Sequence, residues 1–252
     1  MKDTRLIMGM PIEIEIAKIE GREKEAKGAL EAAYAYLVEV DNRFSTYKEE
    51  SEISRFNRGE VKRDELSPEM QEVFAIGEET RERTYGYFDI RHPDGHVDPS
   101  GVVKGLAIKH AAELIRNAGF EDYMVNAGGD IAMHGTDDAG GAWSVGIRNP
   151  FNIDEIVKVV YPGGKGIATS GSYIRGAHIY SPHEPGKELK EIVSITVIGP
   201  DVLEADLMAT AAFAMGTQGA GFIERLDGYE AYAIDAAGTA TFTSGFAVYT
   251  EK

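Results

Sequence analysis

The period of the hydrophobic pattern changes along this chain, and this feature constrains the fold more than any other. Residues 6–19 alternate apolar and charged positions, which is typical of a strand with one solvated face. Residues 23–41 instead place apolar side chains at every third or fourth position, as a helix with one buried face requires. With 252 residues, the chain can combine both kinds of element in one large domain or in two small intertwined ones.

The rest of the chain continues this mixture of elements. Helices are expected over residues 68–84, with Ser67 as N-cap, and over about 103–118. A buried strand is expected over residues 192–199, followed by an alanine-rich helix over 202–215. The C-terminal region predicts two strands joined by Ala-Ala-Gly, a plausible hairpin. Because neither a repeat nor a low-complexity linker interrupts the pattern, we expect an α+β fold.

Composition narrows the kinds of site that the chain can build. It has no cysteine, so disulfides, thiolate nucleophiles and zinc–sulfur centres are excluded, and any metal must be held by oxygen or imidazole ligands. Its formal charge of −16 disfavours nonspecific binding to nucleic acid or to anionic membranes. No segment approaches the roughly 18 to 20 apolar residues that span a bilayer. We therefore expect a cytoplasmic protein as the chain stands, or a periplasmic or cell-surface protein if a signal peptide was removed.

Two pairs of residues could bind a metal ion or an anionic ligand. Asp206 and Thr210 lie four residues apart on the helix expected over 202–215, so a carboxylate and a hydroxyl share one face and could reach one hard cation. The alternative is a first-turn charge and a core threonine. Asp98 and Lys104 flank a Ser-Gly turn that opens a helix, where backbone N–H groups and an ammonium could meet an anion. Its spacing is not that of a P-loop, and an ordinary capped loop is the alternative.

Two further signals are weaker. Residues 126–130 (NAGGD) bring two glycines and an acid to a strand end, which favours either close backbone approach to a ligand or an ordinary turn. His178 follows a polar loop and could project from a strand edge, although a lone histidine is more often structural than catalytic. A serine hydrolase is not indicated, since the G-x-S-x-G elbow is missing.

Seven segments, taken in order, resemble the ApbE family of FAD:protein FMN transferases over almost the whole chain. Residues 44–57 keep every named position of the family pattern F-S-x-Y-x-x-x-S-E-I-S-x-x-N, and residues 125–131 match V-N-x-G-G-D-I. The other matching segments are LIMGMPIEI, GYFDI, VDPSGVVKGLAI, GIATSGSYIRGAHIYSP and EADLMATAAFAMG. Seven motifs in the family's order are far more specific than any one of them, so the resemblance favours the functional alternative at each.

The resemblance implies a fold and a set of site residues. The fold would be α+β, a single domain over residues 1–252 with mixed or antiparallel sheets flanked by helices and a flavin cleft between two subregions. Asp206 and Thr210 would bind Mg²⁺ through their side chains, and main-chain oxygens near Gly101 and Ala209 would complete the protein's share. His178 and Asp206 would be the catalytic residues, with His178 or an acidic neighbour taking the proton. The implied FAD contacts are Met8, Tyr47, Tyr87, Phe88, Asp89, Asp98, Lys104 and Tyr180.

The reaction that the resemblance implies is a magnesium-dependent phosphoryl transfer. A Thr or Ser hydroxyl of an acceptor redox protein would attack the FMN phosphorus of FAD, and AMP would leave. The acceptor residue would lie in a short Asp-x-x-[Ser/Thr]-Gly-Ala-[Ser/Thr] motif, which this chain lacks, so self-modification is not expected. With water as acceptor, the same site would be an FAD pyrophosphatase that releases FMN and AMP. A protein of the same family pattern could also bind FAD without catalysis, or keep the fold as a scaffold without a ligand.

The chain departs from the family pattern at a few positions. Pro99 and Ser100 replace the usual Leu-Gly, and Ser181 replaces the Asp of the His-Ile-x-Asp-Pro segment. An Asp that commonly follows the start of the Lys-Gly helix is absent at Lys109 and His110. None of these changes removes an implied metal ligand.

Overall fold

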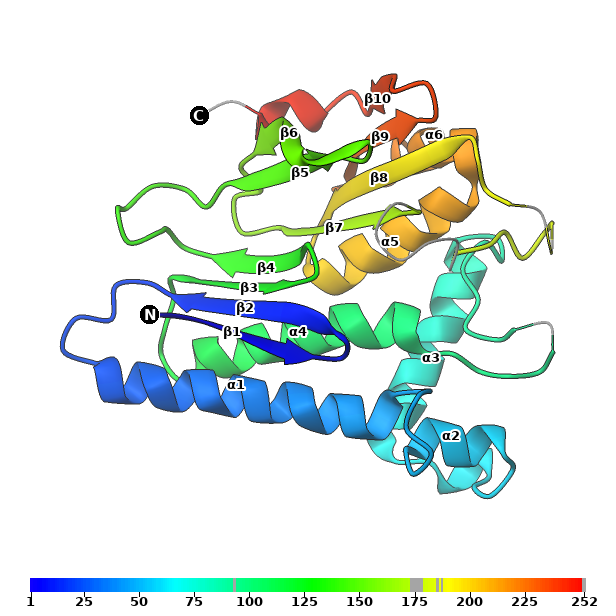
Figure 1. Ribbon diagram of the computed structural model, residues 1–252, viewed down its shortest axis with the longest axis horizontal. Helices are drawn as coiled ribbons and strands as arrows, with labels where there is room; N and C mark the ends of the chain where they lie inside the picture. Colours follow the sequence, from blue (N-terminus) through cyan, green and yellow to red (C-terminus); the bar gives the residue numbers. More distant parts are fainter. Residues whose placement is uncertain (93, 173–178, 185, 187, 251–252) are drawn as a thin grey trace.

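The computed structural model of the protein describes residues 1–92, 94–172, 179–184, 186 and 188–250 (Figure 1). Its strands are β1 (Lys2–Ile7), β2 (Met10–Ile16), β3 (Tyr123–Ala127), β4 (Asp130–His134), β5 (Val145–Asn149), β6 (Asn152–Val160), β7 (Gly166–Gly171), β8 (Ile192–Gly199), β9 (Glu230–Asp235) and β10 (Ala240–Phe242). Its helices are α1 (Glu23–Phe44), α2 (Glu52–Asn57), α3 (Pro68–Arg83), α4 (Ser100–Asn117), α5 (Val202–Ala214) and α6 (Gly219–Ile223).

The strands confirm the α+β class. Within the described residues, eight strands form one sheet in the order β1-β2-β3-β4-β7-β8-β9-β10, and β5 pairs with β6 as a separate hairpin. Every pair in both sheets is antiparallel. Because β4 pairs directly with β7, the N-terminal and C-terminal halves of the chain share one sheet.

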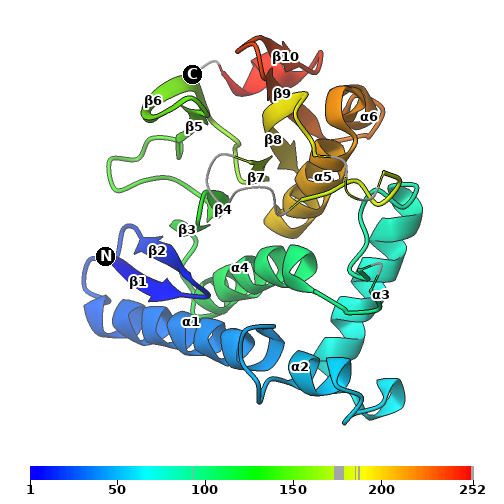
Figure 2. The same ribbon diagram turned by 45° about the vertical axis from the view of Figure 1, so that its right-hand side comes forward.

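Helices α1, α4 and α5 pack against the strands of this sheet. Helix α4 packs between α1 and α5, and Figures 1 and 2 show α1 and α4 running side by side near the β1–β2 hairpin, with α5 against β7 and β8. The main core lies between this helical layer and the sheet. A second, smaller core lies around Trp143 and Phe246, together with apolar side chains of β4, β7, β8 and β9. The eight-stranded sheet is therefore buried on both faces over its centre.

Small residues bring α4 and α5 close together. Helix α5 is rich in alanine and almost entirely buried, as the sequence predicts for residues 202–215. A Cβ atom at Gly105 of α4 would lie only 2.8 Å from the Cα of Leu203 and 3.2 Å from the Cβ of Asp206. No side chain fits at this crossing, so glycine allows the two helix backbones to approach. This contact places the residue before Gly105, Lys104, beside Asp206.

The N-terminal prediction was wrong in one respect. The segment 6–19 is not a single strand, because β1 and β2 form a hairpin that turns at Met8 and Gly9. Both turn residues have positive φ, 53° and 72° respectively. Methionine rarely adopts this conformation. Because the turn also lacks the Asn-Gly or Asp-Gly pair that usually marks a tight hairpin, the sequence pattern did not predict it.

Other boundaries agree with the sequence to within a few residues. The expected helix over 68–84 is α3, and the Ser67 hydroxyl accepts a hydrogen bond from the Met70 N–H (3.2 Å) as its N-cap. Strand β8 spans the predicted residues 192–199. Helix α4 begins three residues before the expected 103, because Asp98 accepts the N–H of Ser100 at 3.0 Å and starts the first turn earlier. None of the helices in the described part of the chain combines the length and the apolarity that crossing a membrane demands.

Candidate functional site

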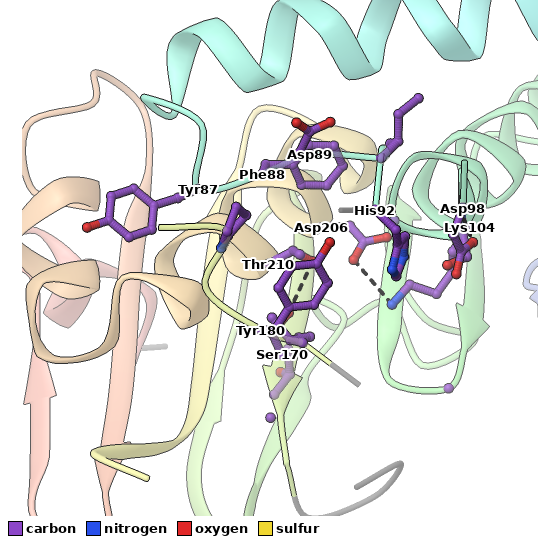
Figure 3. Close-up of a pocket in the computed structure, with 18 residues that line it drawn as sticks. Tyr87, Phe88, Asp89, His92, Asp98, Lys104, Ser170, Tyr180, Asp206 and Thr210 are labelled. Carbon is purple, nitrogen blue, oxygen red and sulfur yellow. Dashed lines mark hydrogen bonds and ion pairs between the residues drawn. The ribbon is translucent and has the colours of Figure 1, made fainter. Parts of the chain in front are cut away.

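A cavity opens where α4, α5 and β7 meet the loop before α4 and the segment before β8 (Figure 3). Its described lining residues are Tyr87, Phe88, Asp89, Ile90, His92, Asp98, Ser100, Gly101, Lys104, Gly128, Thr169, Ser170, Gly171, Ile179, Tyr180, Pro182, Asp206 and Thr210. Two further hollows adjoin it. One shares Asp89, Tyr180 and Pro182 with it, and the other shares His92 and Asp98. We refer to the three adjoining hollows together as the cleft.

A buried cluster of charges lies on the cleft wall. The ammonium of Lys104 contacts the carboxylate of Asp130 and lies 3.2 Å from Oδ1 of Asp206. Both aspartates are 2% exposed, and Asp130 also accepts the N–H of Thr169 at 3.0 Å. Charges buried this deeply need partners of opposite sign, and the lysine supplies one to both carboxylates. These three side chains together carry a formal charge of about −1, so the wall suits a ligand that brings a cation.

Oxygen donors surround this cluster. Thr210 lies one turn after Asp206 on α5, and its hydroxyl is 3.4 Å from that of Ser170 on β7 (Figure 3). Carboxylate and hydroxyl oxygens suit a hard cation such as Mg²⁺. In the part of the chain that the structure describes, no group of three or more His, Asp or Glu side chains could hold a metal alone. This donor set fits Mg²⁺ only as a partial shell, which is how Mg²⁺ is usually bound, with water and substrate phosphates as further ligands.

The two backbone positions expected near a metal differ in their surroundings. Gly101 lines the cleft in the first turn of α4, and a Cβ there would lie 3.0 Å from the ring of Phe88. Glycine therefore lets the buried Phe88 ring pack closely against the start of α4, and a larger residue would require that ring to shift. Ala209 is fully buried within α5, and it is not among the described residues that line the cleft.

Most of the residues expected to contact FAD converge on the cleft. Tyr87, Phe88, Asp89, Asp98, Lys104 and Tyr180 line the central cavity. Tyr47 lines the adjoining hollow and is 97% exposed, so its ring is accessible for packing. Met8 does not join them: it packs against the main core from the β1–β2 turn and is absent from the described lining of the three hollows. Asp89 is already paired with Arg81, whose Nε lies 2.8 Å from Oδ2.

Tyr180 brings a buried hydroxyl to the cleft. Its oxygen makes no hydrogen bond to any residue that the structure describes. Burial, followed by the negative charges of Asp89, Asp94 and Asp98, raises the pKa of Tyr180. The phenol therefore stays protonated at neutral pH and can donate to a ligand in the cleft. Its ring also contacts that of His92, with the ring centroids 5.4 Å apart.

Reasoning from the sequence assigned no individual role to three residues of this site. Asp130 belongs to the NAGGD segment, where Gly128 and Gly129 make the turn between β3 and β4 at φ values of 63° and 101°. The turn interpretation was correct, yet the acid that follows the turn also joins the charge cluster. Ser170 lies within the matched segment GIATSGSYIRGAHIYSP but received no role of its own, and His92 lies in none of the matched segments, although both line the cleft. His178, expected to be catalytic, lies outside the described residues.

Comparison with known proteins supports one family. The family model described as the ApbE family matches residues 8–92 and 91–233. The FAD:protein FMN transferase of Salmonella typhimurium is 35% identical over 152 residues, which cover 56% of this chain and 43% of that protein. The chain thus matches less than half the length of this curated relative.

Two solved structures share the fold over nearly their whole length. The flavin transferase ApbE from Vibrio cholerae superposes with a TM-score of 0.82 at 23% identity, covering 99% of this chain and 98% of that one. The ApbE protein from Thermotoga maritima gives a TM-score of 0.84 at 18% identity, covering 100% and 99%. At these identities the superpositions establish a shared fold.

Proposed function

The chain belongs to the ApbE family, and we propose that it is an FAD:protein FMN transferase. The observation that supports this proposal is the convergence of Lys104 on α4 with Asp206 and Thr210 on α5 at one cleft wall. The cluster of Lys104, Asp130 and Asp206 has a formal charge of about −1 in a protein of formal charge −16, so in this proposal the polyanionic substrate brings a divalent cation with it and contacts the Lys104 ammonium. The name of the Salmonella relative supports FAD as donor and a protein as acceptor.

In this proposal the chain's residues bind and orient FAD. Tyr47 packs on a ring in the adjoining hollow, and Tyr87 and Phe88 form part of the wall of the central cavity. Lys104 contacts the anionic part of FAD, and Asp130 and Asp206 hold the ammonium in place. Bidentate or multiple anchoring of this kind lowers the barrier by fixing the reacting atoms near each other.

Phosphoryl transfer then proceeds by displacement at the FMN phosphorus. The hydroxyl oxygen of an acceptor Thr or Ser forms the new O–P bond while the bond to the AMP phosphate breaks and AMP departs. The hydroxyl proton passes to His178 or to an acidic neighbour. Asp206 and Thr210 would hold Mg²⁺, with main-chain oxygens near Gly101 and Ala209. When bound, this ion would neutralise charge on the pyrophosphate.

A single incubation tests the proposal. The full chain is mixed with FAD and Mg²⁺, with and without a peptide that carries the Asp-x-x-[Ser/Thr]-Gly-Ala-[Ser/Thr] motif, and both AMP and peptide mass are measured. We expect AMP release together with a peptide heavier by one FMN group. Equal AMP release without peptide modification would indicate an FAD pyrophosphatase instead. Stable FAD binding without AMP would indicate a non-catalytic flavin protein.

A further inference from the structure

A second cavity lies on the opposite side of α4 from the cleft. It occupies about 270 Å³ between α1, α3 and α4. Figures 1 and 2 show α3 passing close to the C-terminal end of α1 and the first turns of α4. The residues that line this cavity, called the groove below, come from these three helices. Helix α4 contributes residues to both the groove and the central cavity of the cleft, but no described residue lines both of them. Lys104, for example, lines only the cleft. The proposed flavin chemistry therefore does not account for it.

The floor of the groove is apolar. Each of the three helices contributes positions spaced by three or four residues, so each turns one face toward it. The floor residues are Val40, Phe44, Val73, Val103, Leu106 and Ala107, and each is at most 9% exposed. A concave apolar floor with a few polar groups at its edge is the usual form of a small-molecule site.

The mouth of the groove is acidic. Three carboxylates, those of Glu39, Glu69 and Glu72, face one guanidinium, that of Arg43. Arg43 is occupied by two of them, with distances of 2.6 Å to Glu39 and 2.8 Å to Glu69. Glu72 forms no ion pair with any described residue. The mouth therefore keeps a formal charge of about −2, which favours a cationic ligand over an anionic one.

A hydrogen-bonded pair of side chains completes the rim. The Tyr36 hydroxyl lies 2.9 Å from Nδ1 of His110, so α1 and α4 are joined at the mouth. Burial, and then the charges of Glu72 and Glu39, raise the pKa of Tyr36 to about 12. The phenol therefore stays protonated, and its oxygen can still accept a hydrogen bond from a bound N–H group.

We infer that this groove binds a small organic cation, namely a primary amine carried on a compact apolar frame. The frame occupies the apolar floor, and the ammonium lies at the mouth among Glu39, Glu72 and the Tyr36 oxygen. Charge complementarity selects the ammonium, because an acid of the same shape would add a negative charge to a mouth that already has an excess. An alcohol of the same shape would keep the contact with the floor and lose the ionic part.

Calorimetric titration of the full chain without FAD tests this inference with three probes of one shape. Phenethylamine, phenethyl alcohol and phenylacetate share the frame and differ in charge. We expect the amine to bind with a Kd below about 1 mM and roughly fivefold more tightly than the alcohol. Phenylacetate should show no binding. Equal affinity for all three probes, or none for the amine, would overturn the inference.

Variants locate the site and separate charge from shape. Glu72→Gln should weaken amine binding by roughly fivefold and leave alcohol binding unchanged, whereas Glu79→Gln, an exposed change on the same helix outside the groove, should alter neither. Leu106→Lys would place an ammonium of the chain at the mouth and should abolish amine binding in protein that circular dichroism shows to be folded. Unchanged amine affinity in Glu72→Gln would reject the site. None of these readouts needs FAD, so their failure would leave the proposed transferase function untouched.

Discussion

At the scale of single residues, the cleft contains buried polar groups that lower the stability of the folded protein. Asp206 and Asp130 are almost wholly buried and share the ammonium of Lys104. Tyr180 buries a hydroxyl that no described residue satisfies. Such groups destabilise the protein without ligand, and a ligand that pairs with them recovers the loss. Substitutions here should therefore separate stability from binding.

Tyr180→Phe removes only the hydroxyl. We expect the ligand-free variant to be as stable as the parent or up to about 1 kcal/mol more stable, because a buried donor that no described residue satisfies is lost. We expect its affinity for FAD to fall by about three- to tenfold, since one hydrogen bond to the ligand disappears. Thermal unfolding and FAD titration measure the two effects. A variant that loses stability and keeps its affinity would show that the hydroxyl is structural.

Asp206→Asn keeps the shape of the side chain and removes its charge. Lys104 then remains with Asp130 as a neutral pair, so stability without ligand should hold. AMP release and peptide modification should both fall by about two orders of magnitude or more, because the proposed metal site loses its carboxylate. Thr210→Val should have a smaller effect in the same direction. Parental activity of Asp206→Asn at limiting Mg²⁺ and excess FAD would contradict the metal assignment.

At the scale of elements, local sequence rules account for most helices and for the buried strand. Helix α3 and its Ser67 cap, strand β8 and the alanine-rich α5 all lie where their patterns place them. The β1–β2 turn was missed, since Met8 takes a left-handed conformation that depends on packing against the core rather than on its own preference.

An ionic and hydrogen-bonded network joins α3, α5 and the turn before β9. Arg83 at the end of α3 contacts Glu204 in the first turn of α5, with 2.8 Å between Nη2 and Oε2, and Tyr229 before β9 donates to the same carboxylate. Burial opposes ionisation of Glu204, but the hydrogen bonds from Arg83 and Tyr229 outweigh it and lower its pKa. Because the folded-state pKa is lowered, this contribution to stability is complete above the unfolded pKa of about 4.5 and is lost as the pH falls below it.

Glu204→Gln tests this linkage. At pH 7 we expect it to reduce the free energy of unfolding by about 1–2 kcal/mol, a range that allows for partial solvent exposure of the pair. The difference from the parent should shrink as the pH is lowered through 4.5 and beyond. Urea unfolding at a series of pH values measures it, with Glu79→Gln as an exposed control that also faces Arg83. A pH-independent difference would mean that ionisation of Glu204 plays no part.

At the scale of the whole molecule, sequence reasoning alone could not assemble the site. Lys104, Asp130, Ser170 and Asp206 come from four segments, and only the strand order that pairs β4 with β7 brings them together. That strand order depends on contacts between residues far apart in the sequence, and the hydrophobic periodicity of a single segment does not predict such contacts. The resemblance of seven ordered motifs predicted the main members of the site, whereas the glycine contact between α4 and α5 explains why Lys104 reaches Asp206.

The acidic charge of the whole chain leads to the last prediction. FAD carries a pyrophosphate into a protein of formal charge −16, so without a divalent ion its binding must work against the mean field. We expect FAD with Mg²⁺ at about a hundredfold its Kd to stabilise the fold by about 2.7 kcal/mol, which corresponds to a rise in Tm of roughly 5–10 °C for a chain of this size. FAD with EDTA should give a much smaller rise. In Asp206→Asn the two conditions should differ little, because the variant lacks the carboxylate through which the ion would act. An equal rise with Mg²⁺ and with EDTA in the parent protein would show that FAD binds here without a metal, and would favour a flavin carrier over a transferase.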